Sequence, residues 1–107
     1  MKEILAAIKT TKCDFNDKVV VDFKRVIEAW RYTVKDVVYH VFPNNAYTLC
    51  FVLSESHCII HTYPEKSLIY LNLFTCMCET DAKFFSMVAD VTDLFTGVVE
   101  NLSIVDR

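Results

Sequence analysis

The chain has 107 residues, 53% of them hydrophobic, and a formal net charge of −3 at pH 7. That length predicts a single domain over residues 1–107, and no apolar run approaches the roughly eighteen residues that a membrane-spanning helix needs. The 11 lysines and arginines are scattered along the chain. The sequence therefore lacks the basic stripe of nucleic-acid-binding domains, and we expect no nucleic-acid partner.

The apolar content also predicts more hydrophobic surface than one small domain buries, which favours a subunit interface. Charges at Lys2, Glu3 and Lys9 interrupt the opening segment, so it does not fit a signal peptide and we expect a cytosolic protein. Five cysteines without a secretory context favour reduced thiols. Cys76 and Cys78 have no second ligand pair at a zinc spacing, so we predict no metal site.

The first half of the chain reads as strand, helix and strand. Residues 2–10 predict a strand, although the same apolar run is compatible with a short helix. Asp14 or Asn16 can cap a helix over 17–34, and a second strand over 37–42 is rich in β-branched and aromatic residues. The helix presents one apolar face, formed by Val19, Val20, Phe23, Val26, Ile27, Trp30 and Val34.

Three further strands, over 47–54, 57–63 and 68–76, are predicted to form a meander. If Ser54 pairs with His57 and Tyr63 with Leu68, strand alternation divides the side chains between two faces. The apolar face, predicted to be core, carries Leu49, Phe51, Leu53, Cys58, Ile60, Ile69, Leu71 and Leu73. The other face, a mixture typical of an active site, a subunit interface or both, carries Thr48, Cys50, Ser54, His57, Ile59, His61, Tyr63, Tyr70, Asn72, Phe74 and Cys76.

A second helix is predicted over 81–95, where Gly97 ends it, followed by a last strand over 98–105. The order β-α-β-β-β-β-α-β predicts an α+β fold. We expect a two-layer sandwich in which two helices cover one face of an antiparallel sheet. The other face of the sheet is expected to pack in a dimer.

The same register places Cys76 across from Glu55 and beside Ser56. Five extended residues separate Ser56 from His61, which is roughly 16 Å at about 3.3 Å for each residue. If these two side chains cooperate, we expect the histidine to come from a second subunit.

Segments 54–57, 60–65 and 74–76 resemble, in order and spacing, the core motifs of the short bacterial and archaeal S-adenosylmethionine decarboxylases. They read Ser-Glu-Ser-His, Ile-His-Thr-Tyr-Pro-Glu and Phe-Thr-Cys. These are self-processing pyruvoyl enzymes of polyamine synthesis. The chain departs from the family pattern at Met77, where glycine is usual, and in its loop before Thr48, which has no glycine.

The resemblance implies cleavage between Glu55 and Ser56, which leaves a β chain of 1–55 and an α chain of 56–107. Ser56 would become a covalent pyruvoyl group, which forms a Schiff base with the substrate and takes up electrons as CO2 leaves. The chain would need no other cofactor for this reaction.

The resemblance also implies roles for further side chains. His61 would be the base in the processing reaction, and Thr48 would assist it. Cys76 would be the proton donor in decarboxylation, because a thiol can hold a proton at neutral pH and still release it. The implied substrate-binding residues are Phe42 and Tyr63, as walls of the nucleoside pocket, and Glu65, as the acceptor for ribose hydroxyls.

Three functions are consistent with the sequence. The first is a homodimeric S-adenosylmethionine decarboxylase with two composite active sites. The second is a pyruvoyl-dependent arginine or ornithine decarboxylase on the same scaffold, and the third is a non-catalytic, unprocessed partner subunit. Taken singly, Ser56 could be an ordinary turn residue, His61 a sheet histidine and Cys76 a small buried side chain. Their joint presence argues against the non-catalytic function, because binding alone needs none of these groups.

Overall fold

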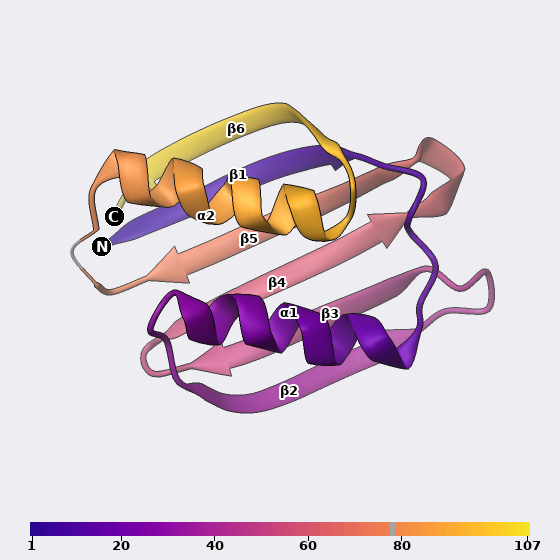
Figure 1. Cartoon of the computed structure of the whole chain (residues 1–107), viewed down its shortest axis with the longest axis horizontal. Helices are drawn as coiled ribbons and strands as arrows, with labels where there is room; N and C mark the ends of the chain where they lie inside the picture. The colour runs from indigo at the N-terminus through magenta and orange to yellow at the C-terminus, as the bar shows by residue number, and fades with distance from the viewer. Residues whose placement is uncertain (78) are drawn as a thin grey trace.

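A computed structural model describes residues 1–77 and 79–107, and within them it has a six-stranded sheet and two α-helices (Figure 1). The sheet is antiparallel, with strand order β2-β3-β4-β5-β1-β6. The elements are β1 (Lys2–Lys9), α1 (Asp17–Ala29), β2 (Val34–Val41), β3 (Tyr47–Leu53), β4 (Ser56–Tyr63), the 3-10 helix η1 (Pro64–Lys66), β5 (Leu68–Thr75), α2 (Asp81–Leu94) and β6 (Val98–Asp106). The predicted α+β class and element order are confirmed.

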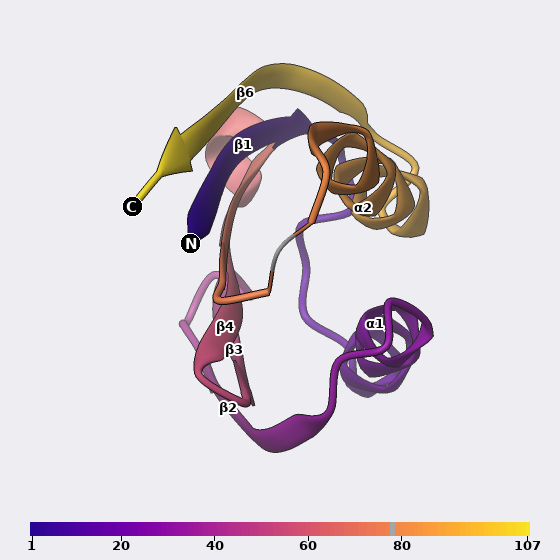
Figure 2. The same cartoon turned by 90° about the vertical axis from the view of Figure 1, so that its left-hand side faces the viewer.

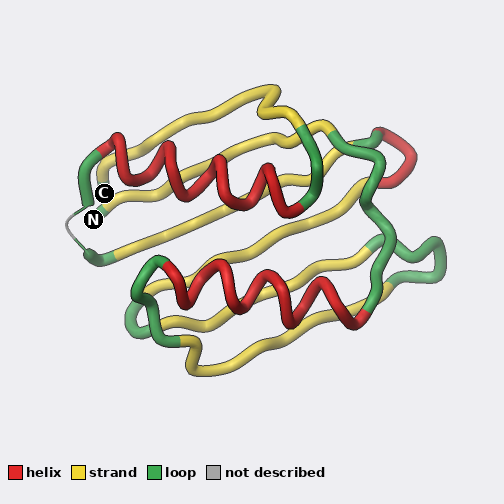
Figure 3. Tube along the Cα trace, viewed as in Figure 1, coloured by secondary structure: helices red, strands yellow, loops and turns green. Residues whose placement is uncertain are grey.

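Both helices lie on the same face of the sheet, and the opposite face carries no helix (Figure 2). Helix α1 lies over the half of the sheet that contains β2, β3 and β4, and α2 lies over the half with β1, β5 and β6 (Figures 1 and 3). We call these two sides the helix side and the open face. The predicted layering is confirmed, while packing of the open face in a dimer stays a prediction.

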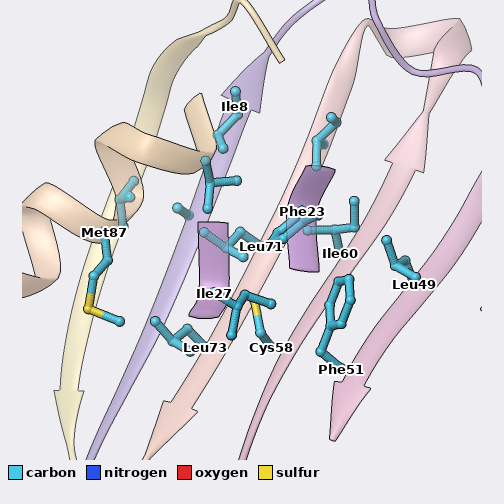
Figure 4. Packing of buried hydrophobic residues seen from close by; sticks show 14 of the residues in the cluster. Ile8, Phe23, Ile27, Leu49, Phe51, Cys58, Ile60, Leu71, Leu73 and Met87 are labelled. Carbon is cyan, nitrogen blue, oxygen red and sulfur yellow. The ribbon is translucent and has the colours of Figure 1, made fainter. Parts of the chain in front are cut away.

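The core lies between the helices and the sheet (Figure 4). Phe23 of α1 contacts Phe51 of β3, with ring centroids 5.2 Å apart, and Ile27 lies near Cys58 and Leu73. All eight residues predicted for the core face of the meander are buried. Burial of each large apolar side chain stabilises the fold by roughly 1.5–3 kcal/mol, so this layer holds the sheet and its site in place.

The register of the β3–β4 hairpin differs from the prediction by two residues. Leu53 rather than Ser54 begins the pairing, opposite Ser56 rather than His57, and the turn consists of Ser54 and Glu55. Because side chains alternate with a period of two, a shift of two leaves the predicted faces unchanged. It does bring Ser56 into β4, on the helix side. The predicted pairing of Tyr63 with Leu68 in the next hairpin is confirmed.

Helix α1 is five residues shorter than predicted. It begins after Asn16, whose side chain accepts a hydrogen bond from the Val19 N–H, but it ends at Ala29. Arg31 adopts a left-handed conformation (φ 75°), which stops the helix, and Val34 belongs to β2 instead. The apolar side chain of Val34 fits the helical spacing in the sequence, although Val34 lies in a strand.

Gly97 follows α2 as predicted, but it is not the residue that adopts the left-handed conformation. That residue is Thr96 (φ 49°), and the Gly97 N–H donates to the Thr92 carbonyl. A Cβ at position 97 would lie 2.7 Å from Ile8 Cγ2 and 2.8 Å from the Lys9 carbonyl oxygen. Glycine is therefore required here for the close approach of the chain to β1.

Candidate active site

The turn between β3 and β4 holds a non-glycine residue in a left-handed conformation. Glu55 has φ 54°, and both Ser54 and Glu55 are exposed. For an L-residue with a Cβ this conformation costs roughly 1–2 kcal/mol. The peptide bond between Glu55 and Ser56 therefore joins an exposed residue in a strained conformation to the buried Ser56.

Ser56 lies directly after this turn and is 7% exposed. Its Oγ accepts a hydrogen bond from the Cys76 N–H (3.2 Å) and donates to Cys76 Sγ (3.7 Å). The Cys76 thiol also lies 3.9 Å from the Ser54 carbonyl oxygen. The structure thus brings the predicted cleavage residue and the predicted proton donor together. We call the cluster of Glu55, Ser56 and Cys76 the Ser56 end of the site.

A second cluster lies at the opposite end of the same strands. Thr48 and His61 pair across β3 and β4 on the open face, and Thr48 Oγ1 is 2.9 Å from His61 Nδ1. They line a pocket of about 400 Å³, within the range of small-molecule sites. The lining residues are Phe42, Asn44, Ala46, Tyr47, Thr48, His61, Thr62, Tyr63 and Glu65. We call this pocket with Thr48 and His61 the His61 end.

The structure therefore divides the predicted site residues into two groups. Five of them, including Phe42, Tyr63 and Glu65, meet at the His61 end, whereas Ser56 and Cys76 meet at the other end of β4. Figure 1 shows this separation: the turn between β3 and β4 lies at one end of the strands, and the turn between β2 and β3 lies at the other end. Neither end of one chain holds all the groups that the predicted chemistry needs.

Four pocket residues were not predicted as site residues from the sequence: Asn44, Ala46, Tyr47 and Thr62. Asn44, which was assigned only to a turn, lines the pocket, and its Oδ1 accepts from the Ala46 N–H (3.2 Å). Tyr47 also lines it, and its hydroxyl has no hydrogen-bond partner within the described part of the chain. Burial raises the pKa of Tyr47. The Pro-Asn-Asn sequence signalled a turn here but not a pocket wall.

A polar network crosses the open face beside the Ser56 end. His57 Nε2 lies 2.6 Å from Asn72 Oδ1, and Asn72 Nδ2 donates to Glu3 Oε2 (2.8 Å). The other Glu3 oxygen accepts from Arg107 Nε (3.0 Å). The Asn72 hydrogen bond, followed by that from Arg107, holds the pKa of the Glu3 carboxyl below its usual value. No sequence motif joins these residues, because they come from distant parts of the chain.

Three of the described thiols, Cys13, Cys50 and Cys58, lie outside the Ser56 end. Cys13, Cys50, Cys58 and Cys76 are free, and Cys78, named in the metal prediction, lies outside the described residues. Burial raises the pKa of Cys13, Cys50 and Cys58, so these three remain protonated at neutral pH.

Within residues 1–77 and 79–107, no three His, Cys, Asp or Glu side chains are grouped so as to hold a metal ion. No helix there combines the length and the apolar character required to cross a bilayer.

Glu3→Gln should lower thermal stability by a few degrees at neutral pH, because it removes a carboxylate that is stabilised by two partners. A group with a depressed folded-state pKa contributes stability above its ordinary pKa, here 4.5, and loses it as the pH falls through the folded value. The difference in melting temperature between wild type and variant should therefore shrink below about pH 4.5.

Melting curves measured by circular dichroism between pH 3 and 7 would test this. Asp106→Asn is the control, because that carboxylate is 84% exposed and should leave the pH dependence unchanged. A Glu3→Gln difference that stays constant across this pH range would contradict the prediction.

Comparison with known proteins places these features in a family. The family model described as S-adenosylmethionine decarboxylase matches residues 5–97. An S-adenosylmethionine decarboxylase proenzyme of Clostridium botulinum (strain Loch Maree) is 36% identical over 53 residues, 50% of this chain and 46% of that protein. That of Clostridium kluyveri is 35% identical over 63 residues, 59% of this chain and 48% of that protein. The chain thus spans about half the length of the curated relatives it matches.

The fold is also shared with a solved structure. The crystal structure of the adenosylmethionine decarboxylase from Aquifex aeolicus superposes with a TM-score of 0.80 and covers 99% of this chain and 88% of that chain. At 19% identity this similarity shows the fold alone. With the family match over residues 5–97, the conclusion is that the chain belongs to the S-adenosylmethionine decarboxylase family.

Proposed function

We propose that this chain is a self-cleaving, pyruvoyl-dependent decarboxylase that acts on S-adenosylmethionine and supplies polyamine (spermidine) synthesis in the cytosol. The observation that carries the proposal is the geometry at the Ser56 end. Ser56 directly follows the left-handed Glu55, and its hydroxyl is hydrogen-bonded to Cys76. In a member of this family, that arrangement fits a serine that attacks its own preceding carbonyl.

The residues present fit a pyruvoyl group made from Ser56. Cleavage after Glu55 would release the strain of its left-handed conformation and leave a β chain of 1–55 and an α chain of 56–107. The new end of the α chain would stay anchored, because β4 pairs with β5 along its length. A pyruvoyl group supplies a ketone that binds an amine and accepts electrons during decarboxylation.

The chain's own side chains would act around this group. Cys76, half-buried beside Ser56, is placed to deliver a proton at the reacting carbon. His61, which is held by the Thr48 hydroxyl, is the proposed base for self-cleavage, and Thr48 fixes the orientation of its ring. At the His61 end, Phe42 and Tyr63 would enclose the adenine and Glu65 would accept ribose hydroxyls.

We further propose that the working unit is a homodimer with two composite sites. Ser56 and His61 are five residues apart on the extended strand β4, roughly 16 Å, so one chain cannot bring them together. A two-fold axis that pairs the open faces would place the His61 end of one chain against the β3–β4 turn of the other, where it would approach the Glu55–Ser56 bond from the open face. Four exposed apolar residues on that face support such burial: Leu5, Val38, Val52 and Tyr70.

Wild-type protein should separate under denaturing conditions into fragments 1–55 and 56–107, and Ser56→Ala should remain one chain. Intact-mass spectrometry checks this, and the mass of the 56–107 fragment should correspond to a ketone at its first residue. A wild type that stays a single chain would overturn the decarboxylase proposal and favour the non-catalytic partner subunit.

Coexpression of Ser56→Ala and His61→Ala chains should restore cleavage. In a mixed dimer, one composite site combines the intact Ser56 of one chain with the intact His61 of the other. Random pairing puts about half of the His61→Ala chains in mixed dimers, so up to that share should be cut. The control is His61→Ala alone, which should stay uncut. Absence of cleavage in the mixture, with mixed dimers shown by differential tags, would contradict the composite site.

The cleaved protein should release labelled CO2 from S-adenosylmethionine and not from arginine or ornithine. Phe42→Ala should raise the KM for S-adenosylmethionine by about tenfold, because one base-stacking contact is worth roughly 1–3 kcal/mol. Release from arginine or ornithine instead would keep the pyruvoyl chemistry and change the substrate to a basic amino acid.

A further inference from the structure

We propose that Tyr32 and Thr75 are positioning residues for self-cleavage, and that they aim the Cys76 backbone N–H at the Ser56 hydroxyl. This inference rests on the proposed cleavage after Glu55. It assigns a role to two buried hydroxyl groups, one from the connection between α1 and β2 and one from the last residue of β5.

The two hydroxyls form a buried pair on the helix side of the sheet. Tyr32 is 6% exposed and Thr75 is fully buried. Tyr32 Oη and Thr75 Oγ1 are 2.7 Å apart, a short hydrogen bond that joins positions 43 residues apart in the sequence. Burial raises the pKa of Tyr32, so its phenol stays protonated and able to donate.

Thr75 uses the same oxygen to hold the chain around Cys76. Its Oγ1 accepts from the Met77 N–H (3.0 Å), a bond to the backbone two residues ahead that closes a tight turn. Cys76 is the residue inside this turn. Its backbone is therefore set from one side by the β5 ladder and from the other by the Thr75 hydroxyl, which Tyr32 in turn holds.

The result of this arrangement is a donor aimed at Ser56. The Cys76 N–H lies 3.2 Å from Ser56 Oγ, in a region where Ser56 is 7% exposed. A fixed N–H stabilises negative charge on the oxygen it faces, and more strongly where water is excluded. The Cys76 N–H belongs to the backbone, so a substitution can change its position but cannot remove it. That position depends on the hydrogen bond from the Met77 N–H to Thr75 Oγ1.

Negative charge arises on Ser56 Oγ in two steps of the cleavage. In the first, a base takes the Ser56 hydroxyl proton, Oγ bonds to the Glu55 carbonyl carbon, and the C–N bond breaks as the base returns the proton to nitrogen, which gives an ester and a free amine. In the second, the Ser56 Cα proton is removed and the Cβ–Oγ bond breaks, with its electron pair leaving on Oγ as part of the new α-carboxylate of Glu55. The resulting enamine takes up a proton at Cβ to become an imine, and water hydrolyses the imine to the ketone and ammonia. The Cys76 N–H faces the charged oxygen in both steps.

The place of the pair in the fold favours this role. Three segments lie at the same end of the strands (Figure 1): the connection that carries Tyr32, the β3–β4 turn and the end of β5. The Tyr32 hydroxyl therefore ties the helix layer to the strand end that holds Cys76. It stays on the helix side, away from the open face where a partner subunit would dock.

The test follows cleavage of newly made chains by pulse-chase in a cell-free translation reaction, with intact mass as the readout. Thr75→Val should slow cleavage at least about tenfold, because the donor is no longer held in place. Thr75→Ser keeps the hydroxyl and should cleave at close to the wild-type rate. The cleavage rate of Tyr32→Phe should lie between those of Thr75→Val and Thr75→Ser. The matched control is Thr92→Val: Thr92 is 7% exposed and its Oγ1 donates to the Val88 carbonyl (2.7 Å), far from Ser56. It should cleave at the wild-type rate.

A second readout does not depend on cleavage. In the uncut Ser56→Ala background, Thr75→Val should accelerate hydrogen exchange of the Met77 amide about tenfold, and Thr92→Val should not. A wild type that cleaves while folded Thr75→Val cleaves equally fast would overturn this inference and leave the proposed function standing. A wild type that never cleaves would overturn the proposed function and the positioning role together.

Discussion

The alternation of side chains along β4 is the constraint on which the rest of this structure depends. Neighbouring residues of a strand point to opposite faces, so Ser56 points to the helix side while His57 and His61 point to the open face. Strands β3 and β5 pair with β4 on both sides and keep it extended. Because β4 is extended, Ser56 and His61 lie roughly 16 Å apart along it. Under the proposed function, the base would therefore come from a second copy of the chain.

The two sides of the sheet consequently have different tasks. On the helix side, the packed core and the Tyr32–Thr75 pair hold the backbone that contacts the Ser56 hydroxyl. On the open face, the network of Glu3, Asn72 and His57 and the pocket beside His61 remain within reach of a ligand or partner. The strain at Glu55, roughly 1–2 kcal/mol, is small against the 5–15 kcal/mol by which a typical domain is stable, so the packed core can hold Glu55 in this conformation.

Apolar periodicity predicted the elements and the faces of the meander because it reflects burial directly, and those residues are buried. It failed at the end of α1, where Val34 continued the helical spacing but belongs to a strand. The hairpin register was wrong because Ser54, Glu55 and Ser56 are all acceptable turn residues, and pairing along the whole strand selects among them. The predicted register of the β4–β5 hairpin placed Cys76 beside Ser56, yet it could not reveal Tyr32, which reaches Thr75 only through tertiary structure.

The loop before Thr48 forms its turn without a glycine. The family pattern led us to expect a glycine there, and the chain has none. Asn45 takes the left-handed conformation instead (φ 65°), which asparagine tolerates better than most residues. Hydrogen bonds from the Phe42 N–H to the Ala46 carbonyl and from the Asn45 N–H to the Phe42 carbonyl close the loop. Phe42 is thereby held at the pocket by a turn whose left-handed residue is an asparagine.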